Sequence, residues 1–328
     1  MRYLVTGGTG FLGPFLIKKL VSGGHLCRCL VRPTGNRKTI QGPGVEIVEG
    51  DVTIPEGLKG IAEGMDRVVH MATLGHMSNS LASQPMFDKV NVKGTVNIMR
   101  EAARAGVDRF IHCSSVAAMG ICPDIPATEE SRCMPHNPYG RSKLKAEKEV
   151  LRMVSETGLH AVIVRFSMVY GPGDPRDILR LTRLAKRGLF PRIGSRSKLT
   201  PLIHMDDAIQ GLLLAMERGR AGQVYLLTNR QSEPFDNIRK VIQEALGGTR
   251  ISLYVPEKAV FLAVYLLEKA CSMAGRTPSI TRKNIESVLA DRAFSIEKAE
   301  KELGFDPGVE PASGLKDTVL WYKKQGWV

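Results

Sequence analysis

Three glycines at a fixed spacing directly follow an apolar segment at the start of the chain. Residues 2–6 have a strand-like composition, and Gly7, Gly10 and Gly13 come next, overlapping an amphipathic run over 11–21. In a strand-turn-helix unit such glycines allow a tight turn, close approach to a pyrophosphate and close packing of the helix on the sheet. The free N–H groups at the helix start also favour an anion. A purely structural turn is the alternative, but this context predicts a dinucleotide-binding loop made of Gly7, Thr9, Gly10, Phe11, Leu12 and Gly13.

Short apolar strands alternate with helical patterns through the first half of the chain. We expect strands at 2–6, 26–31, 45–48, 67–71, 109–113 and 160–165, and helices at 11–21, 84–105 and 138–157. This alternation is typical of an α/β fold, here a Rossmann-type doubly wound parallel sheet. A Gly-Pro-Gly-Asp-Pro cluster follows Tyr170, and helices outnumber strands from there on. The expected division is a dinucleotide-binding domain over 1–170, completed by parts of 201–230, and a smaller, mostly helical substrate lobe over 171–200 and 231–328.

Composition narrows the class of protein further. A chain of 328 residues with 43% hydrophobic and 24% charged residues is neither disordered nor fibrous. The chain enters strand 2–6 at once, and its longest apolar run, 259–267, is far shorter than the roughly 20 residues that span a bilayer. We therefore expect a cytoplasmic protein. The six cysteines form no Cys-x-x-Cys pair and no cluster with histidine, which predicts reduced thiols, no metal site, and core positions for Cys27 and Cys29.

A tyrosine and a lysine lie four residues apart at the start of helix 138–157. This spacing places the phenol of Tyr139 and the ammonium of Lys143 on one helix face, where the positive charge is expected to lower the tyrosine pKa. Ser115 follows strand 109–113, and the carboxyl ends of strands are where open α/β sheets bind ligands. A Tyr-x-x-x-Lys pattern alone is frequent by chance. Together with the serine and the glycine loop it predicts a catalytic trio of Ser115, Tyr139 and Lys143.

Arg32 occupies the position that reads the adenosine ribose, about 20 residues past the glycines. An acidic side chain there would accept from the 2′-hydroxyl of NAD, whereas a guanidinium can bind a 2′-phosphate. Arg37 and Lys38 follow in the next loop and are expected to add positive charge on the same side. The sequence therefore favours NADP over NAD, with an exposed surface arginine as the alternative.

Further motifs stand in order along almost the whole chain: Gly50-Asp51-Val52, His70-Met71-Ala72, Asn91-Val92-Lys93-Gly94-Thr95, Ser114-Ser115, Gly171-Pro172 and His204-Met205-Asp206-Asp207. With the glycine loop and the Tyr-x-x-x-Lys pattern, they resemble the extended short-chain dehydrogenases/reductases of the NAD-dependent epimerase/dehydratase superfamily. The resemblance implies hydride transfer at nicotinamide C4, with Tyr139 moving the proton and Asn91 holding the sheet near the active site. It implies further cofactor-site residues: Asp51, Val52, Met71, Ala72, Thr73, Asn91, Tyr139, Lys143 and Phe166.

The same resemblance implies two structural roles. Helices 84–105 and 138–157 would pair two chains in a homodimer, as is common among family members. His204 and Asp206 would brace the junction between the lobes.

Departures from the family pattern narrow the reaction. Val116 and Ala117 stand where family 4,6-dehydratases carry an Asp-Glu pair, so dehydration is not expected. Met168 and Thr200 replace the Asn and Arg that hold the diphosphate in sugar-nucleotide members. The C-terminal lobe instead resembles the 3β-hydroxysteroid dehydrogenase, dihydroflavonol reductase and hopanoid-associated epimerase-like members, on motifs at 277–281, 294–299, 302–307 and Trp321.

We therefore expect an NAD(P)-dependent oxidoreductase acting on a secondary alcohol or ketone of an apolar or lipid-like small molecule. An NDP-sugar epimerase with tightly bound NAD is the first alternative. A non-catalytic, nucleotide-sensing protein is a remote one, because such relatives typically lack the tyrosine and lysine found here.

The net charge of +13 indicates an anionic partner, namely a phosphorylated ligand, an anionic membrane or a nucleic acid. Basic residues do not alternate with aromatic ones, so nucleic acid is not expected. Eight Lys/Arg oppose two Asp over 174–200, and the expected helix there aligns Arg176, Arg180, Arg183 and Arg187 on one face. This face is solvated, or it meets a phosphate-bearing substrate or an anionic membrane.

A helix over 257–273 is expected to be apolar almost all round between residues 259 and 267. Such a helix is buried or meets a partner. One prediction is that this helix is buried within the lobe. The other is that it forms a lipid-facing surface or a lid over an apolar substrate, and a lipid-facing surface would allow peripheral membrane contact.

Overall fold

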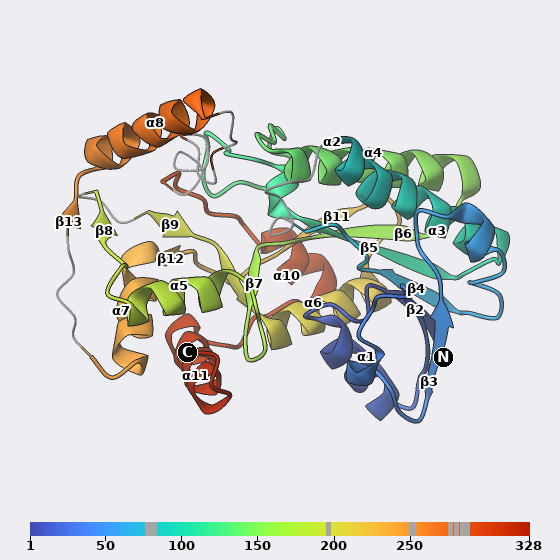
Figure 1. Cartoon of the computed structure of the whole chain (residues 1–328). Helices are drawn as coiled ribbons and strands as arrows, with labels where there is room; N and C mark the ends of the chain where they lie inside the picture. The colour runs from blue at the N-terminus through green and yellow to red at the C-terminus, as the bar shows by residue number, and fades with distance from the viewer. Residues whose placement is uncertain (76–83, 195–197, 249–253, 275–277, 279–281, 283–288) are drawn as a thin grey trace.

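The computed structural model describes residues 1–75, 84–194, 198–248, 254–274, 278, 282 and 289–328. Within these residues a seven-stranded parallel sheet has the order β11-β6-β5-β4-β1-β2-β3 (Figure 1). Its strands are β1 (Arg2–Thr6), β2 (Leu26–Val31), β3 (Val45–Glu49), β4 (Arg67–His70), β5 (Arg109–Ser115), β6 (Ala161–Phe166) and β11 (Val224–Leu227). The chain order reverses beside β1, and open α/β sheets bind ligands at such a switch point. The predicted Rossmann-type fold is confirmed.

Helices cover both faces of this sheet. On one face lie α1 (Gly13–Ser22), α6 (Met205–Arg218) and α10 (Glu297–Leu303), and on the other lie α3 (Gly94–Arg104) and α4 (Pro138–Thr157). Neighbouring strand residues point into opposite cores, so Leu4 packs with α3 and α4 while Val5 packs with α1. Both side chains are fully buried, which explains why the strands read as continuous apolar runs. Cys27 and Cys29 are unpaired and lie in the α1 core, as predicted.

The predicted helix 84–105 is divided into three consecutive pieces. These are α2 (Gln84–Phe87), a π-helical turn (Asp88–Lys93) and α3. A π-helical turn inside a helix is rare and often marks a functional site. Here it carries Asn91, which is buried and faces the carboxyl edge of the sheet.

A second core lies outside the sheet and is built mainly by helices. α5 (Asp177–Lys186), α7 (Phe235–Ala245) and α11 (Pro311–Lys324) pack around the buried Tyr170 and Tyr322. Short strand pairs join them: β7 (Met168–Tyr170) with β10 (Leu202–His204), β8 (Arg192–Ile193) with β13 (Tyr254–Val255), and β9 (Leu199–Thr200) with β12 (Glu233–Pro234). The lobe is mostly helical as predicted, while strands of two or three residues are too short to leave an alternating pattern in the sequence.

Helix α8 (Glu257–Met273) has the predicted bounds, but it is not buried within the lobe. It lies at the margin of the molecule, away from the sheet (Figure 1), and Val264 is its one buried residue. Leu262 and Leu266 are 59% and 57% exposed. Burial within the lobe is therefore wrong, and a partner-facing surface or a substrate lid remains. Among the described helices none is long and apolar enough to cross a membrane.

Candidate active site

The glycine loop after β1 is built as a dinucleotide site requires. Gly7 has φ +73°, and a Cβ there would lie 2.6 Å from the backbone nitrogen of Ala72. A Cβ on Gly13 would lie 2.0 Å from the carbonyl oxygen of Gly8, so the helix packs directly on the turn. Gly10 is less crowded, since its Cβ would meet only the Gly7 oxygen, at 3.2 Å. In the described part of the chain no side chain caps α1 and its first turn holds no acid, so the loop fits a pyrophosphate.

The segment after β4 lies against this loop. The backbone N–H of Met71 donates to the Thr6 carbonyl (3.1 Å), and that of Ala72 donates to Thr6 Oγ1 (3.2 Å). Thr6 Oγ1 also lies 2.8 Å from Nδ1 of the buried His70. The structure thus brings Met71, Ala72 and Thr73 to the switch point beside Gly7, and their contact with a cofactor stays a prediction.

Asn91 ties this segment to helix α4. Its Oδ1 accepts the N–H of Leu74 (2.7 Å) and the hydroxyl of Thr73 (3.1 Å). Its Nδ2 donates to the Leu74 carbonyl (3.2 Å) and to Ser142 Oγ (2.9 Å). The side chain is 2% exposed, and both its amide protons and its oxygen are engaged. Asn91 therefore holds the sheet edge, as the resemblance implied, while direct cofactor contact stays a prediction.

Ser115, Tyr139 and Lys143 meet at the carboxyl edge of the sheet. Ser115 ends β5 and pairs in register with Phe166, the last residue of β6. Tyr139 lies in the first turn of α4, and Lys143 lies one turn further. The buried Lys143 Nζ donates to the carbonyl of Cys113 (2.8 Å) and lies 6.0 Å from the Tyr139 ring centroid.

A close backbone contact forces this convergence. A Cβ on Gly140 would lie 2.2 Å from the carbonyl oxygen of Ala117, so α4 packs directly against the turn after β5. Asn137 begins the helix, because its Oδ1 accepts the N–H of Gly140 (2.7 Å). Ser115 Oγ accepts the N–H of Ala117 (3.2 Å), which fixes the serine on the same turn.

The pKa of Tyr139 differs from the prediction. Burial raises the pKa of Tyr139, and a hydrogen bond with Ser115, the charge of Arg176 and a hydrogen bond with Thr73 oppose this rise. The lowering of this pKa that we expected from Lys143 therefore does not outweigh the effect of burial. Burial lowers the pKa of Lys143 itself to about 8. The site therefore holds a neutral phenol beside an ammonium that loses its proton more readily than usual.

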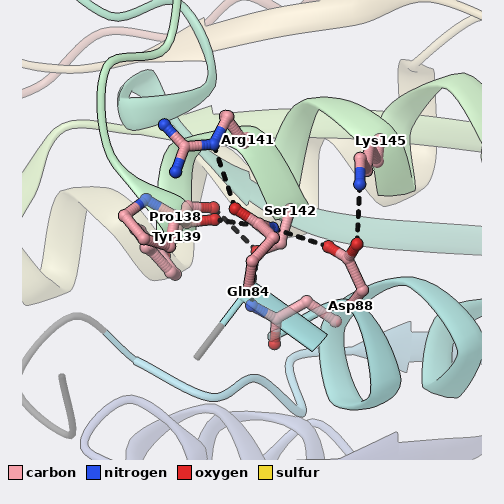
Figure 2. A network of polar contacts seen from close by, with 8 residues as sticks. Gln84, Asp88, Pro138, Tyr139, Arg141, Ser142 and Lys145 are labelled. Atoms are coloured by element: carbon pink, nitrogen blue, oxygen red, sulfur yellow. Dashed lines mark hydrogen bonds and ion pairs between the residues drawn. The ribbon is translucent and has the colours of Figure 1, made fainter. Parts of the chain in front are cut away.

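A polar network fixes the start of α4 against α2 (Figure 2). Gln84 Nε2 donates to Asp88 Oδ1 (2.7 Å) and to the carbonyl of Pro138 (3.4 Å), and its Oε1 accepts from Arg141 Nε (3.0 Å). These contacts involve the residues on either side of Tyr139. They restrain the turn that carries the phenol.

An ion pair that we had not predicted lies beneath the trio. Arg165 on β6 donates through Nε (3.1 Å) and Nη2 (2.8 Å) to the carboxylate of Glu147, and their side chains are 5% and 3% exposed. Ser114 Oγ also donates to Glu147. Glu147 lies one turn after Lys143 on α4, so the pair joins α4 to β5 and β6. The sequence signal for this ion pair was Arg165 itself, the one charged residue in the otherwise apolar strand β6.

Arg32 lies where the sequence placed it, at the end of β2. Its side chain is exposed, and within the described residues its guanidinium makes no hydrogen bond or ion pair. Arg37, expected to add charge on this side, is paired instead with Glu49 on the neighbouring strand β3. Lys38 is exposed. Arg32 and Lys38 therefore remain exposed positive charges after β2, and their contact with an adenosine ribose stays a prediction.

Asp51 and Val52 follow β3 at the same edge. Asp51 Oδ1 accepts the N–H of Thr53 (2.8 Å), and the Val52 carbonyl accepts from Asn97 Nδ2 (2.9 Å). Val52 is buried under α3. Their predicted contact with adenine stays a prediction.

The predicted brace at the lobe junction is only half right. His204 is buried, packs edge-on against Tyr170 with ring centroids 5.4 Å apart, and accepts the N–H of Asp206 at Nδ1. The Asp206 side chain, however, is 67% exposed. Its neighbour Asp207 is buried and accepts the N–H of Gly308 (3.0 Å). Asp207, and not Asp206, therefore joins α6 to a distant segment of the same chain.

A family model and two known proteins match this chain over most or all of its length. The family model described as the NAD dependent epimerase/dehydratase family matches residues 3–228. Sterol demethylase protein B of Methylococcus capsulatus is 29% identical over 340 residues, covering 100% of both chains. A 4-hydroxy-2-methyl-3-oxo-4-farnesyl-3,4-dihydroquinoline-1-oxide ketoreductase of Stigmatella aurantiaca is 29% identical, covering 96% of this chain and 95% of its own.

A solved structure agrees with the sequence matches. The dTDP-glucose 4,6-dehydratase DesIV of Streptomyces venezuelae, solved with NAD bound, has a TM-score of 0.82 and 27% identity, covering 100% of this chain and 98% of its own. The family match covers more than half of the chain, and these relatives are enzymes by name. The chain therefore belongs to the NAD dependent epimerase/dehydratase family, the extended short-chain dehydrogenases/reductases that its motifs predicted.

Proposed function

We propose that this enzyme transfers hydride between a nicotinamide cofactor and a secondary alcohol or ketone of an apolar, lipid-like molecule. One observation carries the proposal: Ser115, Tyr139 and Lys143 converge beside the glycine loop, and Val116 and Ala117 follow the serine. This arrangement has a proton donor and hydroxyl-binding groups. It lacks an acidic pair directly after Ser115, where a dehydratase would carry it.

The raised pKa of Tyr139 fits the direction of ketone reduction. A bound nicotinamide would supply the hydride at its C4. The neutral phenol of Tyr139 then donates its proton to the carbonyl oxygen as negative charge develops there. Ser115 holds the same oxygen from the β5 side. Lys143, fixed by the Cys113 carbonyl, places a cation behind the phenol and stabilises the phenolate that remains.

The surroundings of the site support an apolar substrate. Met168 on β7 and Thr200 on β9 offer no charge to a diphosphate, and Thr200 is buried. Arg192, the nearest described arginine to Thr200 in the sequence, is paired with Asp236 (3.1 Å). The exposed apolar side chains of α8 supply an uncovered surface in the same lobe. Relatives whose names refer to a sterol and a farnesylated ketone point the same way.

An NDP-sugar epimerase is the second candidate, because the similarity to DesIV, which is named as a dTDP-glucose 4,6-dehydratase, favours a sugar-nucleotide substrate. We expect UDP to leave the melting temperature unchanged, because Met168 and Thr200 replace the two side chains that usually hold the diphosphate. Thermal shift with UDP at saturating concentration measures this. A clear shift that disappears in Arg192→Ala would contradict the oxidoreductase proposal; Arg196, the other candidate for such a contact, lies outside the described residues.

Cofactor choice depends on Arg32. We propose that NADP(H) binds more tightly than NAD(H), because the unpaired guanidinium can donate to a 2′-phosphate. One charge-assisted contact of this kind contributes about 1.5–3 kcal/mol, or about 10- to 150-fold in affinity. The preference should weaken at high salt, since the side chain is exposed. Arg32→Asp should reverse it.

Titration calorimetry with both dinucleotides measures this preference. Arg2→Asp is a matched control. Arg2 is also an exposed arginine, but it lies at the amino end of β1, whereas Arg32 follows the carboxyl end of the parallel strand β2. If the wild type binds NAD(H) at least as tightly as NADP(H), and Arg32→Asp changes neither affinity, Arg32 is a surface residue without a role in binding.

The binding role of each lobe is also a proposal. We infer that 1–170 with parts of 201–230 bind the dinucleotide, and that 171–200 with 231–328 bind the substrate. The assignment of parts of 201–230 to the first domain is supported by β11, which pairs with β6 at the edge of the large sheet. A homodimer through the helical segments 84–105 and 138–157 stays a prediction of the family resemblance. A cytoplasmic location stays a prediction from the sequence.

A further inference from the structure

Arg176 is anchored in the second lobe by buried partners. Its Nε donates to Asp174 Oδ1 (2.6 Å), and its Nη2 donates to the carbonyl of Val169 (2.9 Å). Asp174 is 1% exposed, and its own carbonyl accepts the hydroxyl of Tyr322 (2.7 Å) from the centre of the lobe core. The guanidinium is therefore held in a defined position, although its side chain is 40% exposed.

From this anchor Arg176 reaches the glycine loop of the first lobe. Its Cζ lies 4.9 Å from the ring centroid of Phe11, which is part of the turn that leads into α1. The positive charge of Arg176 also opposes the rise in the pKa of Tyr139. Within the described residues Nη1 makes no hydrogen bond, so this nitrogen is available to a ligand. Arg176 thus contacts the glycine loop from an anchor in the second lobe.

The glycine loop itself supplies no full positive charge to a pyrophosphate. Residues 7–13 carry no charged side chain, and the basic residue in the last turn of α1 is Lys19, at the far end of the helix. Helix N–H groups and the helix dipole offer only partial positive charge to a pyrophosphate, which bears two negative charges. A guanidinium matches phosphate oxygens in geometry and stays charged at all working pH values.

We propose that Arg176 binds the pyrophosphate of the dinucleotide from the side opposite the glycine loop, so that the cofactor is held between the two lobes. The inference rests on the proposed function in one respect, since it needs a dinucleotide on the glycine loop. It adds a cofactor-binding residue that comes from the substrate lobe. An anionic group on the substrate, such as a carboxylate, is the other anion that Arg176 could meet, and the test separates the two.

ADP-ribose and adenosine are the probes, because only ADP-ribose carries the pyrophosphate. Titration calorimetry on the full chain is expected to show ADP-ribose binding about 10- to 100-fold weaker in Arg176→Met than in the wild type. Adenosine affinity should not change. Arg180→Met is the matched control: Arg180 is exposed on α5, one turn further along, and its affinity for both probes should equal that of the wild type.

A second variant, Arg176→Lys, distinguishes loss of the phosphate contact from loss of folding. Arg176→Lys keeps the charge but cannot keep the bonds to Asp174 and Val169 while reaching a phosphate, so ADP-ribose should bind with an affinity between those of Arg176→Met and the wild type. Raised salt should reduce the difference between Arg176→Met and the wild type.

Three results would overturn the inference. Wild-type affinity for ADP-ribose in both Arg176 variants would do so while leaving the proposed function intact, and it would assign Arg176 to a substrate anion or to structure. Equal weakening of ADP-ribose and adenosine would show a general disturbance of the loop. Failure of the wild type to bind ADP-ribose at all would overturn this inference together with the proposed function.

Discussion

Replacing Tyr139 with phenylalanine is expected to lower kcat by about 10²- to 10⁴-fold, with cofactor affinity almost unchanged. The variant loses the proton donor but keeps the ring that packs against Phe87, with centroids 6.3 Å apart. Because burial keeps the phenol neutral, the loss should be greatest for ketone reduction, where the donated proton is required. Steady-state reduction of an apolar ketone and calorimetry with the reduced cofactor measure the two quantities.

Two further variants give this prediction its controls. Tyr254→Phe removes an exposed hydroxyl on β13, and its turnover should match that of the wild type. Lys143→Ala should lower both turnover and cofactor affinity, because the buried ammonium lies beside the phenol and the sheet edge. Full turnover in Tyr139→Phe would remove the trio from the mechanism.

Arg165→Leu is expected to lower the free energy of unfolding by about 3–5 kcal/mol. The substitution leaves the carboxylate of Glu147 almost completely buried without its guanidinium partner, and the remaining donor from Ser114 compensates little. A loss of this size is a large fraction of the roughly 5–15 kcal/mol by which native proteins are stable. Urea denaturation followed by circular dichroism measures it.

A surface ion pair provides the comparison. Arg230 contacts Glu300 and, at 2.8 Å, Asp306, but its side chain is 54% exposed. Solvent screens such a pair, so Arg230→Leu should leave the free energy of unfolding almost unchanged. Equal, small losses in both variants would show that the Glu147–Arg165 pair contributes nothing beyond an ordinary surface contact.

The parts of the structure that follow local rules were predictable from the sequence. β1 and β2 have their predicted bounds, because each is a short apolar run limited by glycine or polar residues. Helix α4 also has its predicted bounds, since Asn137 and Pro138 start it and Gly158, with φ +71°, ends it. The steric limits at Gly7 and Gly13 made the glycine loop equally recognisable.

Features that depend on distant parts of the chain were not predictable. The pattern of α8 showed an apolar surface but not whether the same chain covers it, and most of that surface is exposed. The pairing of Arg37 with Glu49 depends on the neighbouring strand β3, and the contact of Arg176 with Phe11 depends on how the lobes meet.

The Tyr139 pKa and the junction aspartate were missed for related reasons. Spacing placed Lys143 near Tyr139, but the degree of burial, which raises the tyrosine pKa, comes from the whole fold. Asp206 and Asp207 are adjacent on α6 and point in different directions, so motif matching could not tell which one faces the lobe junction.

Transfer of deuterium from C4 of the reduced nicotinamide tests the proposed reaction most directly. The wild-type enzyme is incubated with deuterated NADPH or NADH and with apolar ketones, including a sterol ketone and a farnesylated ketone, and the products are examined by mass spectrometry. The account predicts a released alcohol that carries deuterium on its carbinol carbon, in molar excess over the enzyme, and formation of that product about 10²- to 10⁴-fold more slowly with Tyr139→Phe. Epimerisation of a UDP-sugar without net consumption of reduced cofactor, together with no reduction of any apolar ketone, would contradict it.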